Sequence, residues 1–427
     1  MTWHPIELEV ATPLFSEGKR DSGADVRISS IRGQLRFWIR ALVGAVVGDD
    51  PVLVGRVESE IMGAAHTEGS RYGTSKIALR MLKPVYMSDG SAPIAGASHD
   101  DARFVKSVKE TGPNKKEFFP LAYLAGLGLT ELDEKTFKLT RQFVRVGAKC
   151  ELGVRHNGCS APAWRVFVAA LRLFLYAGGI GSRARKGFGS VRVLASDIDE
   201  LLPARNSGAF VRDALLNPAQ QFGGLASDIA EILERSETDF RGAPEHGSRM
   251  PVLGRGVRAD LVGPPRTTRF GNKWTQALKE VGRDYRLFRA DQDAPTANYF
   301  PQRKSQEWLN ALNGRSNHAP IAALGLPIVY KPDRILNLRR NGAELRWPSP
   351  LHVHLITGAT GPTISVLSFV FQVKFPINDG YGRDMSLASR RNFNVVEHSA
   401  TVTGDLEGMT DAWFATLHGT PTSRPSL

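Results

Sequence analysis

Apolar and polar residues follow each other along the first half of the chain at spacings that predict both strands and helices. Residues 5–12 carry Ile6, Leu8 and Val10 at every second position, as in a strand with one buried face. Residues 30–47 and 162–176 carry apolar residues at helical spacing. The same patterns predict strands at 76–87, 118–127, 138–155 and 190–194 and a short helix at 53–61. The order β-α-β…β-α-β predicts an α+β domain of ferredoxin-like, or RRM-like, topology.

The second half of the chain shows similar patterns less regularly. Residues 195–245 contain short helical stretches broken by Pro, Gly and Asn, as expected of a linker or a helical insertion. Beyond them, a strand is predicted at 249–260, a helix at 275–289 and strands at 345–356 and 364–373. This half is therefore a second αβ region, and the Pro/Ser/Thr-rich tail from residue 419 is predicted to be disordered.

The net charge of the chain indicates what kind of partner the protein binds. Lys and Arg number 55 against 43 Asp and Glu, which gives a net charge of +12 and favours a polyanionic partner. Basic stretches at 27–40, 183–192 and 389–391 contain no acid, and a fourth at 334–346 contains one. Four aromatic residues near these cations could stack on bases, although each would also fit a core position: Phe37, Phe188, Tyr285 and Trp347.

One predicted helix carries arginines on a single face. Arg32, Arg36 and Arg40 recur every four residues, and no acid interrupts them. Like charges at this spacing repel each other by about a few tenths of a kcal/mol per pair, which a bound anion would offset. The stripe therefore predicts phosphate contacts, with a solvated helix face as the alternative. Glu58 and Glu60 on the next helix are interpreted as capping or ion-pair residues.

The strongest local signal is a glycine-rich loop between a predicted helix and a predicted strand. Residues 178–191 contain five glycines and three cations but no acid, so they can present backbone N–H groups and positive charge to phosphates. P-loops and dinucleotide sites place such a loop before a helix, which argues against both. A helix C-cap and tight turn would account for one or two of the glycines. The residues predicted to clamp a nucleic-acid strand are Gly179, Gly181, Ser182, Arg183, Arg185, Lys186, Gly187 and Phe188.

No motif typical of an enzyme active site is found in the sequence. HExxH, GxSxG and paired-carboxylate patterns are absent. His352 and His354 would make only half of a metal site, so no metal or cofactor is predicted. His4, His156 and Tyr176 could serve a metal-free ribonuclease if they face RNA near the glycine-rich loop, but nothing in the sequence places them there.

The sequence also gives an expectation about the cellular compartment. The spacing of Cys150 and Cys159 fits neither a disulfide framework nor a zinc site, which suits a reducing compartment. We see no signal peptide and no apolar run long enough to span a bilayer. The chain is therefore expected to be cytoplasmic and to have no membrane contact.

Several of these segments form one set of motifs in a fixed order. They are residues 12–15 (Thr-Pro-Leu-Phe), residues 27–40 and the glycine-rich loop. This set resembles the RAMP superfamily of CRISPR effector proteins and, more narrowly, the first subunit of the type III-B (Cmr) complex. The likeness continues in residues 58–63, where Met62 replaces a common aromatic, and in segments 285–289, 325–328 and 349–351.

The resemblance implies a fold and a role. It implies two ferredoxin-like domains packed together in a non-catalytic subunit that holds the 3′ region of the guide crRNA and helps capture target RNA. Other Cmr subunits would be its protein partners, and target cleavage would belong to the repeating backbone subunits. The basic helix and the glycine-rich loop would converge on one positively charged cleft that grips the RNA backbone.

The resemblance and the hydrophobic patterns together predict four parts of the chain. They are an N-terminal ferredoxin-like domain at 1–195, a linker or helical insertion at 196–248, a C-terminal ferredoxin-like domain at 249–418 and a disordered tail at 419–427. Two other functions stay open. One is a metal-independent RAMP endoribonuclease that matures crRNA, and the other is a protein scaffold that never touches RNA.

Overall fold

The computed structural model describes most of the 427-residue chain. The described residues are 2–16, 24–64, 73–96, 110–111, 117–126, 129–133, 136–202, 207–244, 247–262, 273–290, 322, 324–325, 328–331, 334–341, 343–357, 364–374, 385–391, 394–398 and 406–418. The predicted disordered tail at 419–427 lies outside them.

The N-terminal part of the chain folds around a four-stranded antiparallel sheet. Its strands are β1 (His4–Val10), β2 (Ile77–Tyr86), β9 (Lys149–His156) and β10 (Val191–Ser196). They pair in the order β10-β1-β9-β2, which is the 4-1-3-2 order of a ferredoxin-like sheet. Two long helices, α1 (Ile28–Val47) and α4 (Ala161–Ala177), form the crossovers. The predicted α+β ferredoxin-like fold is therefore confirmed.

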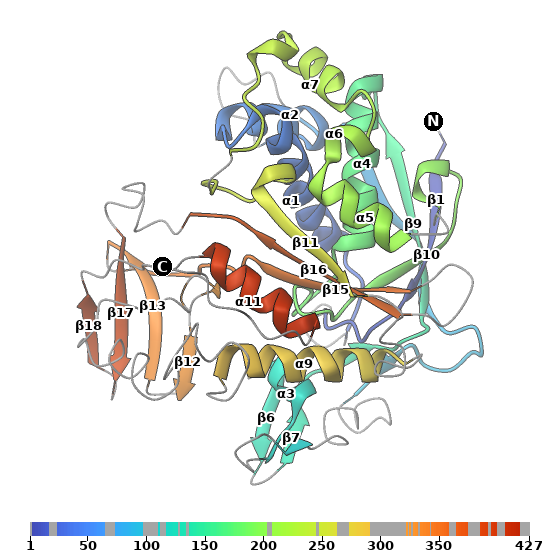
Figure 1. Ribbon diagram of the computed structural model, residues 1–427. Helices are drawn as coiled ribbons and strands as arrows, with labels where there is room; N and C mark the ends of the chain where they lie inside the picture. The colour runs from blue at the N-terminus through green and yellow to red at the C-terminus, as the bar shows by residue number, and fades with distance from the viewer. Residues whose placement is uncertain are drawn as a thin grey trace.

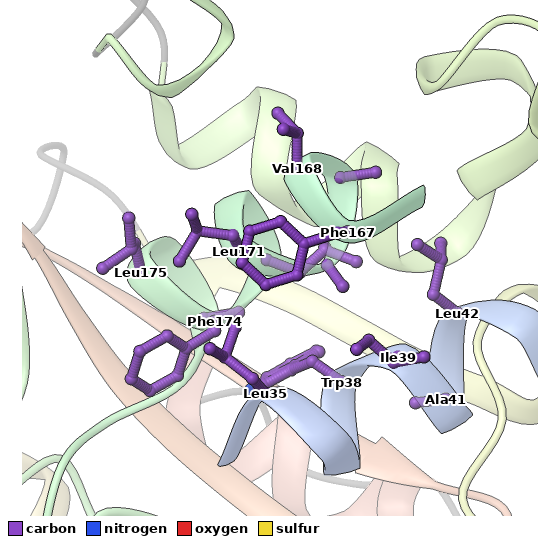
Figure 2. Packing of buried hydrophobic residues seen from close by; sticks show 14 of the residues in the cluster. Leu35, Trp38, Ile39, Ala41, Leu42, Phe167, Val168, Leu171, Phe174 and Leu175 are labelled. Carbon is purple, nitrogen blue, oxygen red and sulfur yellow. The ribbon is translucent and has the colours of Figure 1, made fainter. Parts of the chain in front are cut away.

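The apolar face of each helix explains this packing. On α1 the buried residues Leu35, Trp38 and Leu42 face Phe167 and Leu171 of α4 (Figure 2). Helix α4 begins where the Ser160 hydroxyl accepts a hydrogen bond from the Ala163 N–H. Helix α2 (Pro51–Met62) begins in the same way at Asp50 and packs beside α1.

The second half of the chain repeats the order of elements. Strand β11 (Val257–Val262), helix α9 (Trp274–Ala290), strands β15 (Leu351–Thr357) and β16 (Ile364–Phe371) and helix α11 (Leu406–His418) follow one another. The sheet order β11-β16-β15 corresponds to strands 1-3-2 of a ferredoxin-like fold, and no fourth strand joins it within the described residues. A separate sheet inserted into this unit contains β12 (Ile328–Lys331), β13 (Arg334–Arg340), β14 (Ala343–Leu345), β17 (Met385–Arg391) and β18 (Asn394–His398).

The two ferredoxin-like units pack together through two hydrophobic clusters, one on each face of the second sheet. The second sheet lies between the helices of the first unit on one face and α9 and α11 on the other (Figure 1). Phe37 and Trp38 of α1 contact Phe371 and Phe369 of β16 with ring centroids 5.6 and 6.0 Å apart. Because both of its faces are covered, nearly every residue of β15 and β16 is buried.

Short elements fill the connections. Helices α5 (Ser207–Leu216), α6 (Pro218–Gln221) and α7 (Leu225–Leu233) cover α4 and α2 and lie within the predicted insertion, whose exact bounds, like the other predicted domain limits, stay a prediction. Three-residue 3₁₀ turns occur at Asp199–Leu201, Glu237–Asp239 and Gly254–Gly256. Small strand pairs are β3 (Ile94–Ala95) with β8 (Phe143–Val144), β4 (Glu110–Thr111) with β5 (Glu117–Phe118), and β6 (Thr130–Asp133) with β7 (Thr136–Leu139).

One predicted strand is wrong. Residues 118–127 were expected to be extended, but Pro120–Ala125 form helix α3, which packs against α9. Pro120 occupies the first helical turn, where its missing N–H costs nothing. In the part of the chain described here, no helix is long and apolar enough to cross a membrane.

Candidate nucleic-acid interface

The glycine-rich loop, residues 178–190, joins α4 to β10 as the helix-loop-strand pattern predicted. Both ends of the loop are held by backbone hydrogen bonds to the segment after β1 or to each other. The Ser182 N–H donates to the Phe15 carbonyl (2.6 Å), the Gly189 N–H donates to the Pro13 carbonyl (3.0 Å), and the Ile180 N–H donates to the Gly189 carbonyl (3.0 Å). These N–H groups are therefore used inside the fold and do not cradle a phosphate, contrary to the expectation for this type of loop.

The second half of the loop docks on the second ferredoxin-like unit. The Arg185 carbonyl accepts from the Val353 N–H (3.0 Å), and Arg185 Nη1 donates to the Ser349 carbonyl (2.8 Å). The Ser190 hydroxyl oxygen accepts from the Leu355 N–H at 3.3 Å. The loop therefore forms the junction between the two units, a role that the sequence did not indicate.

Part of the clamp predicted for a nucleic-acid strand is buried and cannot contact one. Phe188 is fully buried, and its ring packs edge-on against Phe15 at 5.6 Å. Lys186 is 7% exposed, and the backbone at Gly179 and Gly187 is buried as well. The prediction that Phe188 stacks on a base is wrong, because the ring is a core residue of the junction.

The exposed tip of the loop consists of Ser182 and Arg183. Arg183 adopts a left-handed backbone (φ 62°), which is uncommon for a residue with a side chain. Its guanidinium lies over Gly126, where a Cβ would be only 2.4 Å from Nη2. Among the described residues Arg183 has no hydrogen-bond or ion-pair partner, so its charge is available to an anion.

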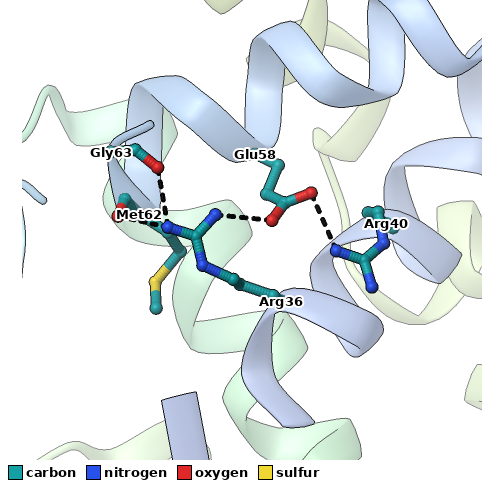
Figure 3. A network of polar contacts seen from close by, with 5 residues as sticks. All are labelled: Arg36, Arg40, Glu58, Met62 and Gly63. Atoms are coloured by element: carbon teal, nitrogen blue, oxygen red, sulfur yellow. Dashed lines mark hydrogen bonds and ion pairs between the residues drawn. The ribbon is translucent and has the colours of Figure 1, made fainter. Parts of the chain in front are cut away.

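The arginine stripe of α1 is not uniformly free. Arg36 donates to Glu58 Oε1 (2.6 Å) and to the carbonyls of Met62 (2.9 Å) and Gly63 (2.7 Å), and Arg40 Nη1 donates to Glu58 Oε2 (3.0 Å) (Figure 3). The interpretation of Glu58 as an ion-pair residue is confirmed. The interpretation of the stripe as wholly unpaired is wrong, because the acid comes from α2 and not from the helix itself.

Arg32 is the free member of the stripe. Within the described residues it has no hydrogen-bond or ion-pair partner. Burial, and secondarily the charge of Arg36, lowers its pKa, but the group stays a cation. Farther along α1, Phe37 lies 5.7 Å from the Arg185 guanidinium, so helix and loop do meet at one place.

The open face of the first sheet carries two arginines over Trp3, Arg80 and Arg155, beside a row of ion pairs. Its carboxylates are each paired with a cation: Glu7 with Lys149 (3.6 Å), Glu9 with Arg192 (2.8 Å) and Glu151 with Lys83 (2.6 Å). The positions that carry stacking aromatics in an RRM sheet are therefore occupied by ion pairs.

The two histidines of β15 are structural. His352 is buried and stacks on Phe369 at 4.7 Å, while His354 Nδ1 lies 3.2 Å from the Ser190 hydroxyl. Burial lowers the pKa of His354 to about 3 and that of His352 well below its usual value. No group of three His, Cys, Asp or Glu in the described ranges is arranged to hold a metal.

These buried histidines should make the fold acid-sensitive. Below about pH 6.5 these histidines are protonated in the unfolded chain but stay neutral in the folded chain. The free energy of unfolding is therefore highest above pH 6.5 and falls as the pH drops. Between pH 7.5 and 5 the loss is about 2 kcal/mol for His354, whose pKa in the folded chain is about 3, and His352 adds a loss in the same direction. In urea unfolding at pH 7.5 and 5, His354→Gln should lose about 2 kcal/mol less than wild type on acidification. An equal loss in both proteins would contradict the assignment.

The histidines considered for a ribonuclease lie elsewhere. His4 and His156 flank Trp164 with ring centroids 5.6 and 5.4 Å away, at the opposite end of β1 from the glycine-rich loop. The Tyr176 hydroxyl donates to the Leu201 carbonyl at 2.9 Å. The structure does not bring these three side chains together at the loop.

Comparison with known proteins supports the family resemblance seen in the sequence motifs. The model of the RAMP superfamily matches residues 7–192. The CRISPR system Cmr subunit Cmr1-2 of Pyrococcus furiosus is 25% identical over 192 residues, which are 44% of this chain and 93% of that protein. The resemblance found in the motifs is thus confirmed for the N-terminal unit.

Two solved structures cover more of the chain. The crystal structure of Cmr1 from Pyrococcus furiosus (apo form) has a TM-score of 0.45 and 16% identity, covering 88% of this chain and 89% of that one. A chain of the type III-B Cmr-beta complex bound to cognate target RNA has a TM-score of 0.45 and 10% identity, covering 97% and 99%. Because both TM-scores are below 0.5, the resemblance to the RAMP superfamily rests on the sequence matches and not on these structures.

Proposed function

We propose that this chain, whose residues 7–192 match the model of the RAMP superfamily, is an RNA-binding subunit of a type III-B CRISPR effector complex. The relative from Pyrococcus furiosus carries the name of a Cmr subunit and matches along 93% of its own length, which supports this assignment. Its partners would be crRNA, target RNA and the other Cmr subunits.

The observation that carries the proposal is uncompensated positive charge on α1 and at the tip of the glycine-rich loop. Arg32 of α1 and Arg183 at the loop tip lack hydrogen-bond and ion-pair partners among the described residues, whereas Arg36 and Arg40 are held by Glu58. Free guanidinium groups bind phosphates well and read no sequence. Base pairing with the guide would supply specificity, as in other RNA-guided systems.

The proposed role is to hold RNA and not to cut it. The subunit would bind the 3′ region of the crRNA and aid capture of the target. His4 lies 3.4 Å from Asp197 in an ion-pair arrangement, far along β1 from the loop, which favours this role over that of a metal-independent nuclease.

A binding and cleavage assay on the purified full chain tests this proposal. Single-stranded RNA labelled at one end is incubated with the protein in EDTA and examined on native and denaturing gels. We expect a salt-sensitive shift and intact RNA. Discrete metal-independent products would support the endoribonuclease instead, and no shift even at 50 mM salt would support the scaffold.

A further inference from the structure

A cluster of cations surrounds one phenol where the glycine-rich loop meets α9. Lys186 Nζ lies 4.2 Å from the centroid of the Tyr285 ring, and the Arg289 guanidinium lies 5.3 Å from the same centroid. Arg289 Nη1 is 3.4 Å from the Tyr285 hydroxyl. Arg183 approaches from the loop tip across Gly126, close enough for its charge to act on Tyr285.

No carboxylate balances this cluster within the described residues. The groups whose charge acts on Lys186 are Tyr285, Arg289 and Arg183, and those that act on Arg289 are Tyr285 and Tyr123. The nearest acid in sequence, Asp284, accepts a hydrogen bond from Arg283 at 3.1 Å. Three like charges gathered at a partly dry junction are unfavourable until an anion joins them.

One donor of the cluster is also left without an acceptor. Arg289 is half-buried, and its buried Nε has no hydrogen-bond partner among the described residues. A buried donor without an acceptor is unfavourable, because it has lost its hydrogen bonds to water. Missing negative charge and a missing acceptor in one place both indicate a ligand that supplies oxygen atoms and negative charge.

We infer that Arg183, Arg289 and the Tyr285 hydroxyl form a seat for one phosphate group of the RNA backbone, with Lys186 adding buried positive charge. The inference rests on the proposed function for the identity of the ligand. It adds Tyr285 and Arg289 of α9 to the proposed RNA interface. The bound phosphate would mark the point where the RNA strand crosses from one ferredoxin-like unit to the other.

The phenol gives this seat a dependence on pH. Burial alone would raise the pKa of Tyr285, but the charges of Arg289, Lys186 and Arg183 outweigh burial and lower the pKa to about 8. The other aromatic groups against the ring are Tyr123 of α3 and Trp413 of α11. Above pH 8 the tyrosinate itself supplies the missing negative charge, so phosphate should bind less tightly at pH 9 than at pH 7.

The test uses the full-length chain with single-stranded RNA and, separately, with inorganic pyrophosphate. At about 0.1 M salt, Arg289→Gln should weaken RNA binding about 5-fold and lower the salt slope by about 0.7, the loss of one phosphate contact. Arg286→Gln, which removes a charge from the same helix, is the matched control and should bind like wild type. Tyr285→Phe should bind RNA more weakly than wild type at pH 7, because the hydroxyl contact is lost, and should show no further weakening between pH 7 and 9.

Pyrophosphate separates a failure of this inference from a failure of the proposed function. It should raise the melting temperature of wild type and of Arg286→Gln but not that of Arg289→Gln. If wild type is stabilised by pyrophosphate yet binds no RNA, the seat stands and the proposed function falls. If Arg289→Gln binds RNA like wild type, the seat is wrong. Should that variant not fold, Arg289→Lys, which keeps the charge but lacks Nε, should give intermediate affinity, and wild-type affinity there would overturn the inference.

Discussion

Substituting Gly189 by alanine should destabilise the protein by about 3–5 kcal/mol, among the largest effects expected of a single substitution. Gly189 has a φ of +66°, which an L side chain adopts at a cost of about 1–2 kcal/mol. A Cβ at this position would also lie 2.0 Å from the carbonyl oxygen of Ile180. Ile180 is the residue whose N–H donates to the Gly189 carbonyl across the loop. The change would push the two halves of the loop apart and loosen the junction that Arg185 and Ser190 make with β15.

Gly55 offers a matched control for that substitution. It lies inside α2, and a Cβ there would meet no atom within 4 Å. Gly55→Ala should be neutral or stabilise the chain by about 0.5–1 kcal/mol, because alanine favours a helix interior. Urea unfolding of both variants measures the difference. Wild-type stability in Gly189→Ala would show that the loop does not have the backbone described.

Replacing Arg32 and Arg183 together by alanine should weaken binding to single-stranded RNA about 25-fold at 0.1 M salt, if each arginine holds one phosphate. The substitutions should leave stability nearly unchanged, because neither side chain has a hydrogen-bond or ion-pair partner among the described residues. Arg165→Ala is the control, since Arg165 is also exposed but its charge is paired with Asp228 on the side of α7. It should bind RNA as wild type does.

Much of the fold was predictable because it depends on local patterns. Strict alternation in β1 and the apolar stripes of α1 and α4 place one face of each element in the core, and their order then gives the ferredoxin-like sheet. Helix α3 was missed because its six residues, Pro120 included, are too few to show a helical period that separates helix from strand. Its helical form depends on packing against α9, more than 140 residues later.

The site was predicted only in outline, for a related reason. The glycine-rich loop and the α1 stripe were identified from their composition, but what each residue does depends on distant partners. Glu58 pairs with Arg36 and Arg40. Arg185 is hydrogen-bonded to Ser349, which precedes β15, and to Val353 of β15. Arg289 was not singled out as a site residue, since only the fold brings α9 to the loop. Its sequence signals were indirect: segment 285–289 is one of the motifs that resemble the RAMP superfamily, and residues 178–191 contain no acid to pair with Lys186.

The dependence of RNA affinity on salt concentration tests the central claim most directly. The logarithm of the association constant is measured against the logarithm of salt concentration for wild type, the Arg32/Arg183 double alanine variant and Arg165→Ala. Each phosphate contact to a single strand contributes about 0.7 to the slope. We expect the double variant to have a slope shallower by about 1.4, with Arg165→Ala unchanged. Equal slopes in all three proteins would show that the RNA, if bound, does not lie on the loop tip and α1.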